Sequence, residues 1–381
     1  MKLENIQGIL DKAIADHAEN GAAAVVTKDG QEVFSCAAGL ADVEGGVPFT
    51  TKTLCRAFSC SKVITSVASM QLIEQGKLDT SWELGWVIPE FSESFYIRNG
   101  KKLESPKIRI RDLLNMTSGI AYPGDTHEGI EGMNDLWGEL DKSINNGNSL
   151  TTQQFAAKAG KQALMYPAGE EWMYGSSADI MGAVVEKISG VRLGDYLRDN
   201  IFAPLGMEDT AFYVPTDKRD RLAVLYENTA QPPKKPEWVN LCIYDYDKAP
   251  AFESGGAGIF TTAKDLSLLG AELSFGGKGV ISRSAVRFMQ QNGLTPDQKR
   301  TFNWDSCKGF GYANLVRMLE DPNAAGLLAS KGSFGWDGWT GTYLLADPLD
   351  KISVTLFVQR CGAGTTPLAR SVVNAAYASL V

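Results

Sequence analysis

The two ends of this 381-residue chain carry strand patterns, and a long stretch with helical patterns separates them. Short apolar runs at 22–27 and 32–37 flank Lys28-Asp29-Gly30, which predicts a β-hairpin. Strand patterns return only near the C-terminus, at 341–346 and 352–359. A chain with this distribution can form one antiparallel sheet from both termini. We therefore predict an α+β fold (an α/β sandwich) in which terminal helices flank the sheet.

The spacing of apolar residues defines the other predicted elements and the domain organisation. Residues 1–75 and 251–381 are predicted to form the sheet domain, and residues 76–250 a mainly helical subdomain, with an active site at their interface. The proline-rich segment 231–236 is predicted to be a surface loop. Helices are predicted over 3–18, 59–76, 108–114, 179–188, 193–201, 262–273, 284–291 and 366–380.

Composition excludes several classes of function. The chain has 37 basic and 45 acidic residues, a net charge of −8, so no basic excess favours nucleic acid. The N-terminus lacks the apolar core of a signal peptide, and no apolar stretch approaches the length of a membrane span. A cytoplasmic protein without a membrane span is therefore expected, and its oligomeric state is left open. With two histidines, His17 and His127, mechanisms that need several imidazoles are excluded.

One serine-based mechanism needs no histidine. Ser59-Cys60-Ser61-Lys62 is an SxxK sequence at the start of an apolar helix, and a spacing of three places Ser59 and Lys62 on one face. A lysine with its ordinary pKa of about 10.4 is a poor base, but burial lowers the pKa by disfavouring the charged form. A neutral Lys62 could then accept the Ser59 proton. By itself the motif is weak, because SxxK also arises by chance.

Two further segments carry candidate functional residues. Tyr174 and Ser176 precede a predicted helix, and the phenol of Tyr174 could relay a proton. The glycine-rich run 334–342 precedes a predicted strand and contains Trp336-Asp337-Gly338-Trp339. Taken alone, the first could be an ordinary interfacial tyrosine and the second a plain turn.

In this order and spacing, the three segments resemble the serine β-lactamase and penicillin-binding-protein-like superfamily. The resemblance is strongest to its class C-related branch, which includes the family VIII carboxylesterases, and it covers most of the chain. Other matching segments are 39–42, 71–79, 110–119, 167–169, 204–207 and 256–262.

The resemblance implies a role for each matching residue. Ser59 would be the nucleophile that forms an acyl-enzyme, Lys62 its general base and Tyr174 the group that protonates the leaving group. The backbone N–H groups of Ser59 and Trp339, the latter following Gly338, would form the oxyanion hole. This chemistry requires no metal and no cofactor.

Two nearby residues are further candidate members of the site. Ser176 stands where the superfamily often has an asparagine that holds a substrate amide, and where esterases often have serine. Asp179 matches an acid of some esterase relatives that supports the tyrosine–lysine network, and a helix N-cap is an equally good interpretation.

The sequence departs from the family pattern at Trp336. Relatives that bind a substrate carboxylate usually have a lysine or histidine there, whereas an indole carries no charge. This favours substrates with neutral acyl groups, unless a different alignment of this segment with the family motif places Lys331 in the site. Tyr122, Trp172 and Trp339 are candidate walls of an apolar acyl pocket.

We therefore predict a serine hydrolase that cleaves small carboxylic esters. A D-amino-acid amidase or peptidase, or a weak β-lactamase, is the alternative within the same superfamily, with a small amide as substrate. The alternative from another class is a catalytically silent relative that binds a ligand. Joint retention of Ser59, Lys62 and Tyr174 argues against the silent relative.

Overall fold

The computed structural model describes residues 2–230, 232–237 and 240–381. Its centre is an eight-stranded antiparallel sheet with the order β3-β2-β1-β12-β11-β10-β9-β8. Strands from the two ends of the chain meet where β1 pairs with β12, with Val25 opposite Thr355. The strands are β1 (Gly21–Lys28), β2 (Gln31–Asp42), β3 (Val47–Pro48), β8 (Phe310–Ala313), β9 (Val316–Leu319), β10 (Phe334–Asp337), β11 (Tyr343–Asp347) and β12 (Ile352–Val358).

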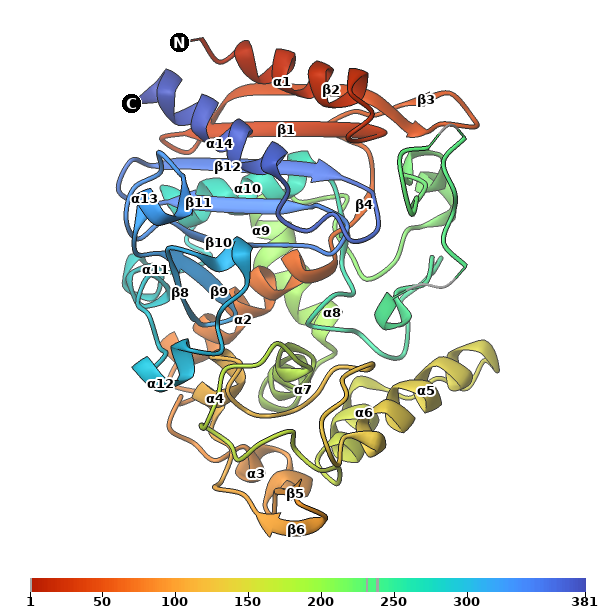
Figure 1. The fold of residues 1–381 in the computed structure, drawn as a ribbon, viewed down its shortest axis with the longest axis vertical. Coiled ribbons are helices and arrows are strands. Elements are labelled where there is room, and N and C mark those ends of the chain that lie inside the picture. The colour runs from red at the N-terminus through yellow and green to blue at the C-terminus, as the bar shows by residue number, and fades with distance from the viewer. Residues whose placement is uncertain (1, 231, 238–239) are drawn as a thin grey trace.

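Helices cover both faces of this sheet (Figure 1). The terminal helices α1 (Asn5–Ala15) and α14 (Pro367–Leu380) contact each other on one face, which brings the two chain ends together. Helix α10 (Ala263–Ser274) packs on β1, β11 and β12. The predicted α+β fold is therefore confirmed.

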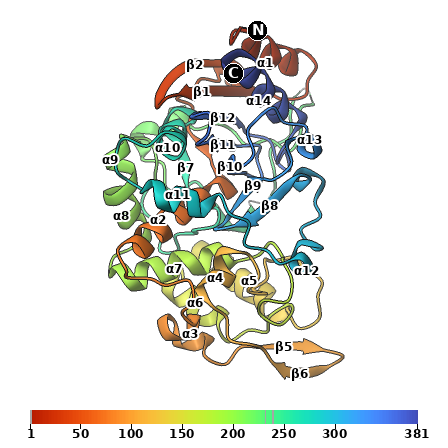
Figure 2. The ribbon, with the colours of Figure 1, turned by 90° about the vertical axis from the view of Figure 1, so that its left-hand side faces the viewer.

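A mainly helical part lies at the opposite end of the molecule from the chain termini (Figures 1 and 2). It includes α3 (Leu84–Val87), α4 (Ile110–Leu114), α5 (Glu131–Asn145), α6 (Thr152–Ala159), α7 (Ser177–Ser189) and the hairpin of β5 (Phe95–Arg98) and β6 (Lys101–Glu104). Helix α2 (Ser61–Glu74) contacts both β10 and α7, so it links the sheet to this part. The two-domain boundaries stay a prediction.

The remaining helices and strands are short or lie at the periphery. They are α8 (Leu193–Leu197), α9 (Ala203–Leu205), α11 (Arg283–Met289), α12 (Pro296–Lys299), α13 (Pro322–Ala325), β4 (Cys55–Arg56) and β7 (Phe260–Thr261). The proline-rich segment has neither helix nor strand at 232–236, and residue 231 lies outside the described residues. None of the helices in the described part of the chain is long and apolar enough to cross a membrane. A cytoplasmic location stays a prediction.

Three strands and one hairpin differ from the sequence-based expectation. Strands β8, β9 and β10 and the β5–β6 hairpin were not predicted, because each has only four residues, too few for a clear alternation of apolar and polar side chains. The predicted hairpin around Asp29-Gly30 is present, with both residues at positive φ, 49° and 77°. That conformation is the one that a two-residue hairpin turn requires.

Strand β10 passes so close to β11 that Gly335 has no room for a side chain. A Cβ at Gly335 would lie 1.9 Å from the backbone carbonyl oxygen of Leu344. We expect Gly335→Ala to lower the free energy of unfolding by about 2 kcal/mol or more, because backbone must shift to relieve the overlap. Urea unfolding measures this effect.

Gly138 provides the matched control. It lies in α5, and a Cβ built there meets no atom within 4 Å. Gly138→Ala should therefore keep or raise the stability, since alanine favours a helix by about 1 kcal/mol over glycine. Equal stability of the two variants would contradict the role assigned to Gly335.

Candidate active site

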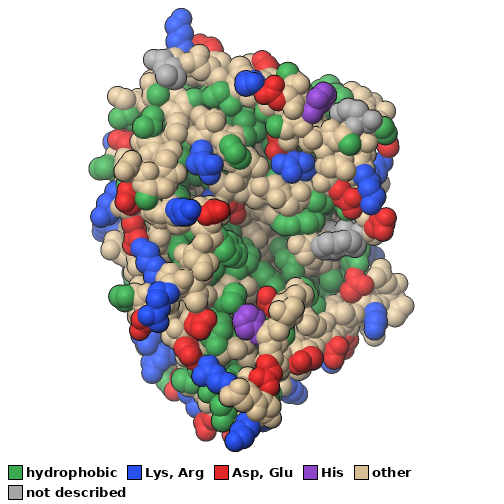
Figure 3. All heavy atoms as spheres, viewed as in Figure 1, with side chains coloured by type: hydrophobic (Ala, Val, Ile, Leu, Met, Phe, Trp, Pro, Cys, Tyr) green, Lys and Arg blue, Asp and Glu red, His purple; other side chains and the backbone are tan. Residues whose placement is uncertain are grey.

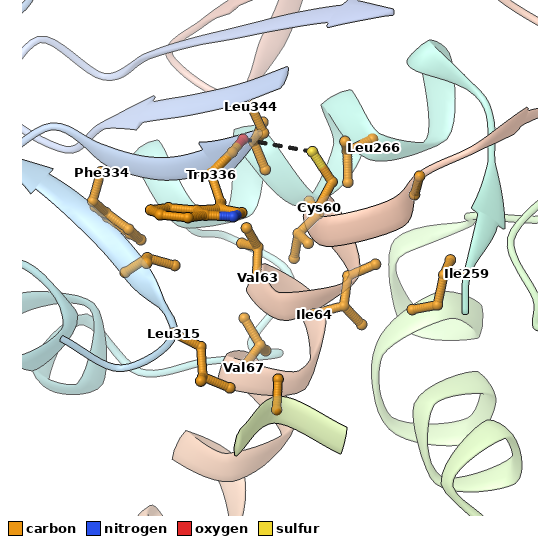
Figure 4. Packing of buried hydrophobic residues seen from close by; sticks show 14 of the residues in the cluster. Cys60, Val63, Ile64, Val67, Ile259, Leu266, Leu315, Phe334, Trp336 and Leu344 are labelled. Atoms are coloured by element: carbon orange, nitrogen blue, oxygen red, sulfur yellow. Dashed lines mark hydrogen bonds between the residues drawn. The ribbon is translucent and has the colours of Figure 1, made fainter. Parts of the chain in front are cut away.

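The turn that carries Ser59 is a constrained segment held by the sheet. Ser59 lies in a 3₁₀ turn, Phe58–Cys60, directly before α2, and not within the helix as predicted. Phe58 has φ 42°, in the left-handed region that a non-glycine residue rarely adopts. Cys60 Sγ donates to the backbone carbonyl of Trp336 over 3.5 Å, as Figure 4 shows. Such strain persists only where the surroundings fix the backbone, as β10 does here.

The glycine-rich segment 334–342 comes close to the turn that carries Ser59, because Gly338 has no side chain. A Cβ at Gly338 would lie 2.1 Å from Thr342 Oγ1 and 2.4 Å from the carbonyl oxygen of Ala57. Thr342 Oγ1 itself donates to that Ala57 carbonyl over 2.7 Å. The ring of Trp339, the next residue, packs edge-on against Phe58 with 5.2 Å between ring centres. Gly338 and Trp339 therefore lie beside the residues that precede Ser59.

Lys62 is fully buried beneath Ser59. Its Nζ donates to Ser59 Oγ over 3.2 Å, to Tyr122 Oη over 3.1 Å and to the carbonyl of Gly256 over 2.8 Å. The amine also lies 4.5 Å from the centre of the Tyr174 ring. Burial lowers the pKa of Lys62 to about 7. A substantial fraction of Lys62 is then a neutral amine near pH 7, as a general base at this position requires.

Tyr174 lies between Ser59 and Trp336. Its hydroxyl is hydrogen-bonded with Ser59 and accepts from the indole Nε1 of Trp336 over 3.1 Å. The two rings stack, with 5.6 Å between centres and 20° between planes. Since the tyrosine oxygen accepts from the indole, its own proton can be directed toward Ser59. Burial raises the pKa of the Tyr174 phenol, so the proton stays on it at neutral pH.

Asp179 is a buried carboxylate near this network. It lies in the first turn of α7 and is 1% exposed. Its Oδ1 accepts from the Ser254 hydroxyl over 2.5 Å and from the Gly256 N–H over 3.2 Å. Burial raises the pKa of Asp179, while its negative charge raises the pKa of Lys62 and so opposes the effect of lysine burial. Its partners lie outside α7, so its hydrogen bonds are not those of an N-cap.

Ser176 and Trp172 lie behind the site surface. Ser176 is 0% exposed, donates to the carbonyl of Ala121 over 2.6 Å and accepts from the indole of Trp137 over 3.3 Å. Its hydroxyl thus fixes the loop before Tyr122, and nothing in its geometry supports the predicted contact with substrate. Trp172 is 1% exposed, so the expectation that its ring walls the pocket is wrong.

The cation nearest to Trp336 comes from β9, and not from Lys331. Lys331 is exposed and precedes β10, at the opposite end of that strand from Trp336, so the alternative register is wrong. The guanidinium of Arg317 lies 5.2 Å from the centre of the Trp336 ring. It is paired with Asp337 over 3.0 Å, and the Arg317 side chain is 3% exposed. Burial works against the charged form of Arg317, yet Asp337 raises the pKa of Arg317, so the guanidinium stays charged.

The described residues contain no group of three or more His, Cys, Asp or Glu side chains that could hold a metal ion. What the arrangement does provide is a serine hydroxyl, a buried amine and a phenol in one hydrogen-bonded chain. This chain lies where α2 and β10 meet the helical part. On the face of the molecule viewed in Figure 1, hydrophobic side chains gather in a hollow near the middle (Figure 3). Such a set can activate a hydroxyl as nucleophile and return a proton to a leaving group.

Comparison with known proteins identifies the class. The beta-lactamase family model matches residues 6–377, so the chain belongs to the beta-lactamase family. Esterase EstB of Burkholderia gladioli is 26% identical over 390 residues, covering 98% of this chain and 94% of EstB. Membership of the superfamily, and with it of an enzyme class, is therefore confirmed.

Solved structures agree with this assignment. The structure of EstCE1, described as a hydrolase with promiscuous acyltransferase activity, has a TM-score of 0.82 and 27% identity, with 98% of each chain covered. A family VIII carboxylesterase structure has a TM-score of 0.72 at 19% identity, covers 99% of this chain and 97% of that chain, and shares the fold.

The sequence did not predict the positions of three residues around the site. Tyr122 was expected only as a pocket wall, but its hydroxyl contacts Lys62. Arg317 and Trp304 lie outside every motif, and Trp304 packs against Tyr174 with 5.2 Å between ring centres. No local signal marks them, because strand pairing and loop packing bring them to the site.

The pKa of Lys62 predicts the pH dependence of acylation. A Lys62 that acts as general base in its neutral form should give a kcat/KM for p-nitrophenyl butyrate that rises with pH, with a midpoint near pH 7, and levels off above it. In Asp179→Asn the negative charge that raises this pKa is lost, so the midpoint should move to lower pH. A midpoint that stays in place or moves upward in the variant would contradict this electrostatic account.

Proposed function

We propose that this protein is a serine hydrolase that cleaves small carboxylic esters through an acyl-enzyme on Ser59. The observation that carries the proposal is the 3.2 Å contact between Ser59 Oγ and the Nζ of Lys62, an amine with no exposed surface. A solvated lysine would be protonated at neutral pH and could not accept the serine proton. The esterase and acyltransferase names of its relatives are in line with ester chemistry.

Acylation begins when Ser59 Oγ attacks the ester carbonyl carbon and its proton passes to neutral Lys62. The developing oxyanion is bound by the backbone N–H groups of Ser59 and Trp339. The carbon–oxygen bond to the alcohol then breaks, and Tyr174 gives its proton to the departing oxygen. The proton held by Lys62 then passes to Tyr174, whose ring centre lies 4.5 Å from the lysine Nζ. The alcohol leaves and the acyl group stays on Ser59.

Deacylation repeats the sequence with water in place of the alcohol. Water loses a proton to the same basic pair and attacks the acyl carbon. Ser59 Oγ then departs and regains a proton, which releases the carboxylic acid. The negative charge of Asp179 keeps the pKa of Lys62 from falling further. Asp179 also accepts a hydrogen bond from the Gly256 N–H, and the Gly256 carbonyl accepts one from Lys62. We therefore assign Asp179 a positioning role, and Ser176 a structural one.

The surroundings of Trp336 favour neutral acyl groups over substrates that carry a carboxylate. Its indole N–H is occupied by Tyr174, so it is not available to a substrate anion. The cation behind it, Arg317, is buried and paired with Asp337. A carboxylate would lose its hydration at this position without a charged partner, at a cost of about 1–3 kcal/mol. This disfavours the peptidase and β-lactamase alternatives.

Mass spectrometry of the intact protein tests the acyl-enzyme. Brief exposure to p-nitrophenyl acetate or butyrate should add the mass of one acyl group, and Ser59→Ala should abolish the addition. Ser66→Ala is the control, because Ser66 is a buried serine of α2 that takes no part in the hydrogen bonds among Ser59, Lys62 and Tyr174. No adduct and no turnover in the unmodified protein would refute the proposed function and favour the silent relative.

The role of Trp336 is tested by Trp336→Phe, which keeps an aromatic ring and removes the N–H. Loss of one hydrogen bond to the general acid should lower kcat/KM about tenfold for an alkyl ester. The loss should be smaller for a p-nitrophenyl ester, because a good leaving group departs with little help from a proton. An equal loss for both esters would indicate a packing defect and contradict the role in proton transfer.

A further inference from the structure

The ring of Trp304 is the exposed member of the aromatic group around Tyr174. Four rings of described residues pack on Tyr174, those of Tyr122, Trp172, Trp304 and Trp336. Trp172 and Trp336 are each 1% exposed, and Tyr122 lies over Lys62. Trp304, by contrast, is 42% exposed, although its ring centre is 5.2 Å from that of Tyr174. A large exposed aromatic surface directly beside a catalytic group can take part in substrate binding.

Trp304 is held in a defined position, as a preformed binding surface requires. Its ring packs edge-on against Trp172 at 5.2 Å, and Trp172 packs edge-on against Phe302 at 4.7 Å. Two hydrogen bonds join the Trp304 loop to the segment that leads to Tyr174. Trp172 N–H donates to Thr301 Oγ1 over 3.0 Å, and Gln298 Nε2 donates to the Gly169 carbonyl over 2.7 Å.

The position of Tyr174 decides which part of the substrate meets this surface. A proton donor must contact the leaving oxygen, so the alcohol portion of the ester lies beside the Tyr174 hydroxyl. A substituent on the alcohol that extends across the Tyr174 ring therefore reaches Trp304.

The charged residue next to Trp304 along the chain already has an ion-pair partner. The nearest charged residue along the chain, Asp305, is paired with Lys308 over 2.8 Å, and their side chains are 94% and 69% exposed. Both are solvated, which leaves the indole face as the contact surface. Such a face binds aromatic or bulky apolar groups, through area burial and ring packing.

From these observations we infer that Trp304 forms the binding surface for the alcohol portion of the substrate and selects esters of aromatic or bulky apolar alcohols. The inference rests on the proposed function, because it takes Tyr174 as the proton donor to the leaving group. By microscopic reversibility, the same surface binds an alcohol that attacks the acyl-enzyme. In that step the alcohol loses its proton to the basic pair, its oxygen bonds to the acyl carbon, and Ser59 regains a proton.

The first test compares two acetates that differ only in the distal part of the alcohol. Let R be the ratio of kcat/KM for 2-phenylethyl acetate to that for ethyl acetate. The acetyl-enzyme is the same for both, so R reports only on the alcohol. In Trp304→Ala, R should fall about tenfold, the effect of losing one aromatic contact and its buried area. Trp304→Phe, which keeps a ring, should retain most of R.

Two controls separate alcohol selection from general damage. Trp86→Ala removes a 67% exposed tryptophan of α3, remote from Tyr174, and should leave R unchanged. The ratio of kcat/KM for ethyl butanoate to that for ethyl acetate reports on recognition of the acyl group. In Trp304→Ala this acyl ratio should stay constant while R falls. If this acyl ratio falls while R is constant, Trp304 contacts the acyl group and the inference is wrong.

A second measurement uses the reverse step. With p-nitrophenyl acetate as donor, added 2-phenylethanol should capture more acetyl groups than equimolar ethanol, and Trp304→Ala should remove this preference. An unchanged R and an unchanged capture preference in active Trp304→Ala would overturn the inference and leave the proposed function standing. If the unmodified protein cleaves neither acetate and forms no adduct on Ser59, the proposed function fails and the inference fails with it.

Discussion

The structure of the site depends on the burial of one amine. Lys62 has no exposed surface, so its charged form lacks hydration and its pKa falls to about 7. A buried amine is stable only with hydrogen-bond partners, and Tyr122, Ser59 and the Gly256 carbonyl supply them. Asp179 limits the fall in pKa because its negative charge favours the ammonium. The balance of these two opposing effects leaves Lys62 able both to accept and to return a proton near neutral pH.

The fold supplies these partners from segments far apart in the sequence. Residues 57–62 approach β10 and β11, where the absence of a Gly338 side chain allows backbone contact with Ala57. The carbonyl that accepts from Lys62 belongs to Gly256, which lies 194 residues further along the chain. These contacts require the sheet to be assembled from both ends of the chain, so the site forms only when the whole fold has formed.

The sequence allowed the fold class to be predicted from patterns that repeat along the chain, and the resemblance to a known superfamily singled out Ser59, Lys62 and Tyr174 as candidate residues. Ser59 and Lys62 are three residues apart, and this spacing brings their side chains into contact across the 3₁₀ turn and the start of α2. Four-residue strands such as β9 carry no such pattern, and the position of Arg317 behind Trp336 depends on strand pairing. The buried position of Ser176 was missed because its partners, Ala121 and Trp137, come from other elements.

Trp336 connects the proton chemistry to the choice of substrate. Its N–H donates to Tyr174, which orients the phenol, and its ring lies against the buried guanidinium of Arg317, which is paired with Asp337. A lysine at this position would bring an unpaired charge next to Lys62 and would lower the pKa of that amine further, since like charges disfavour each other. An indole orients Tyr174 without that repulsion. The lack of a cation for a substrate carboxylate therefore follows from the uncharged side chain of Trp336, whereas the pKa of Lys62 is set by its burial and by the charge of Asp179.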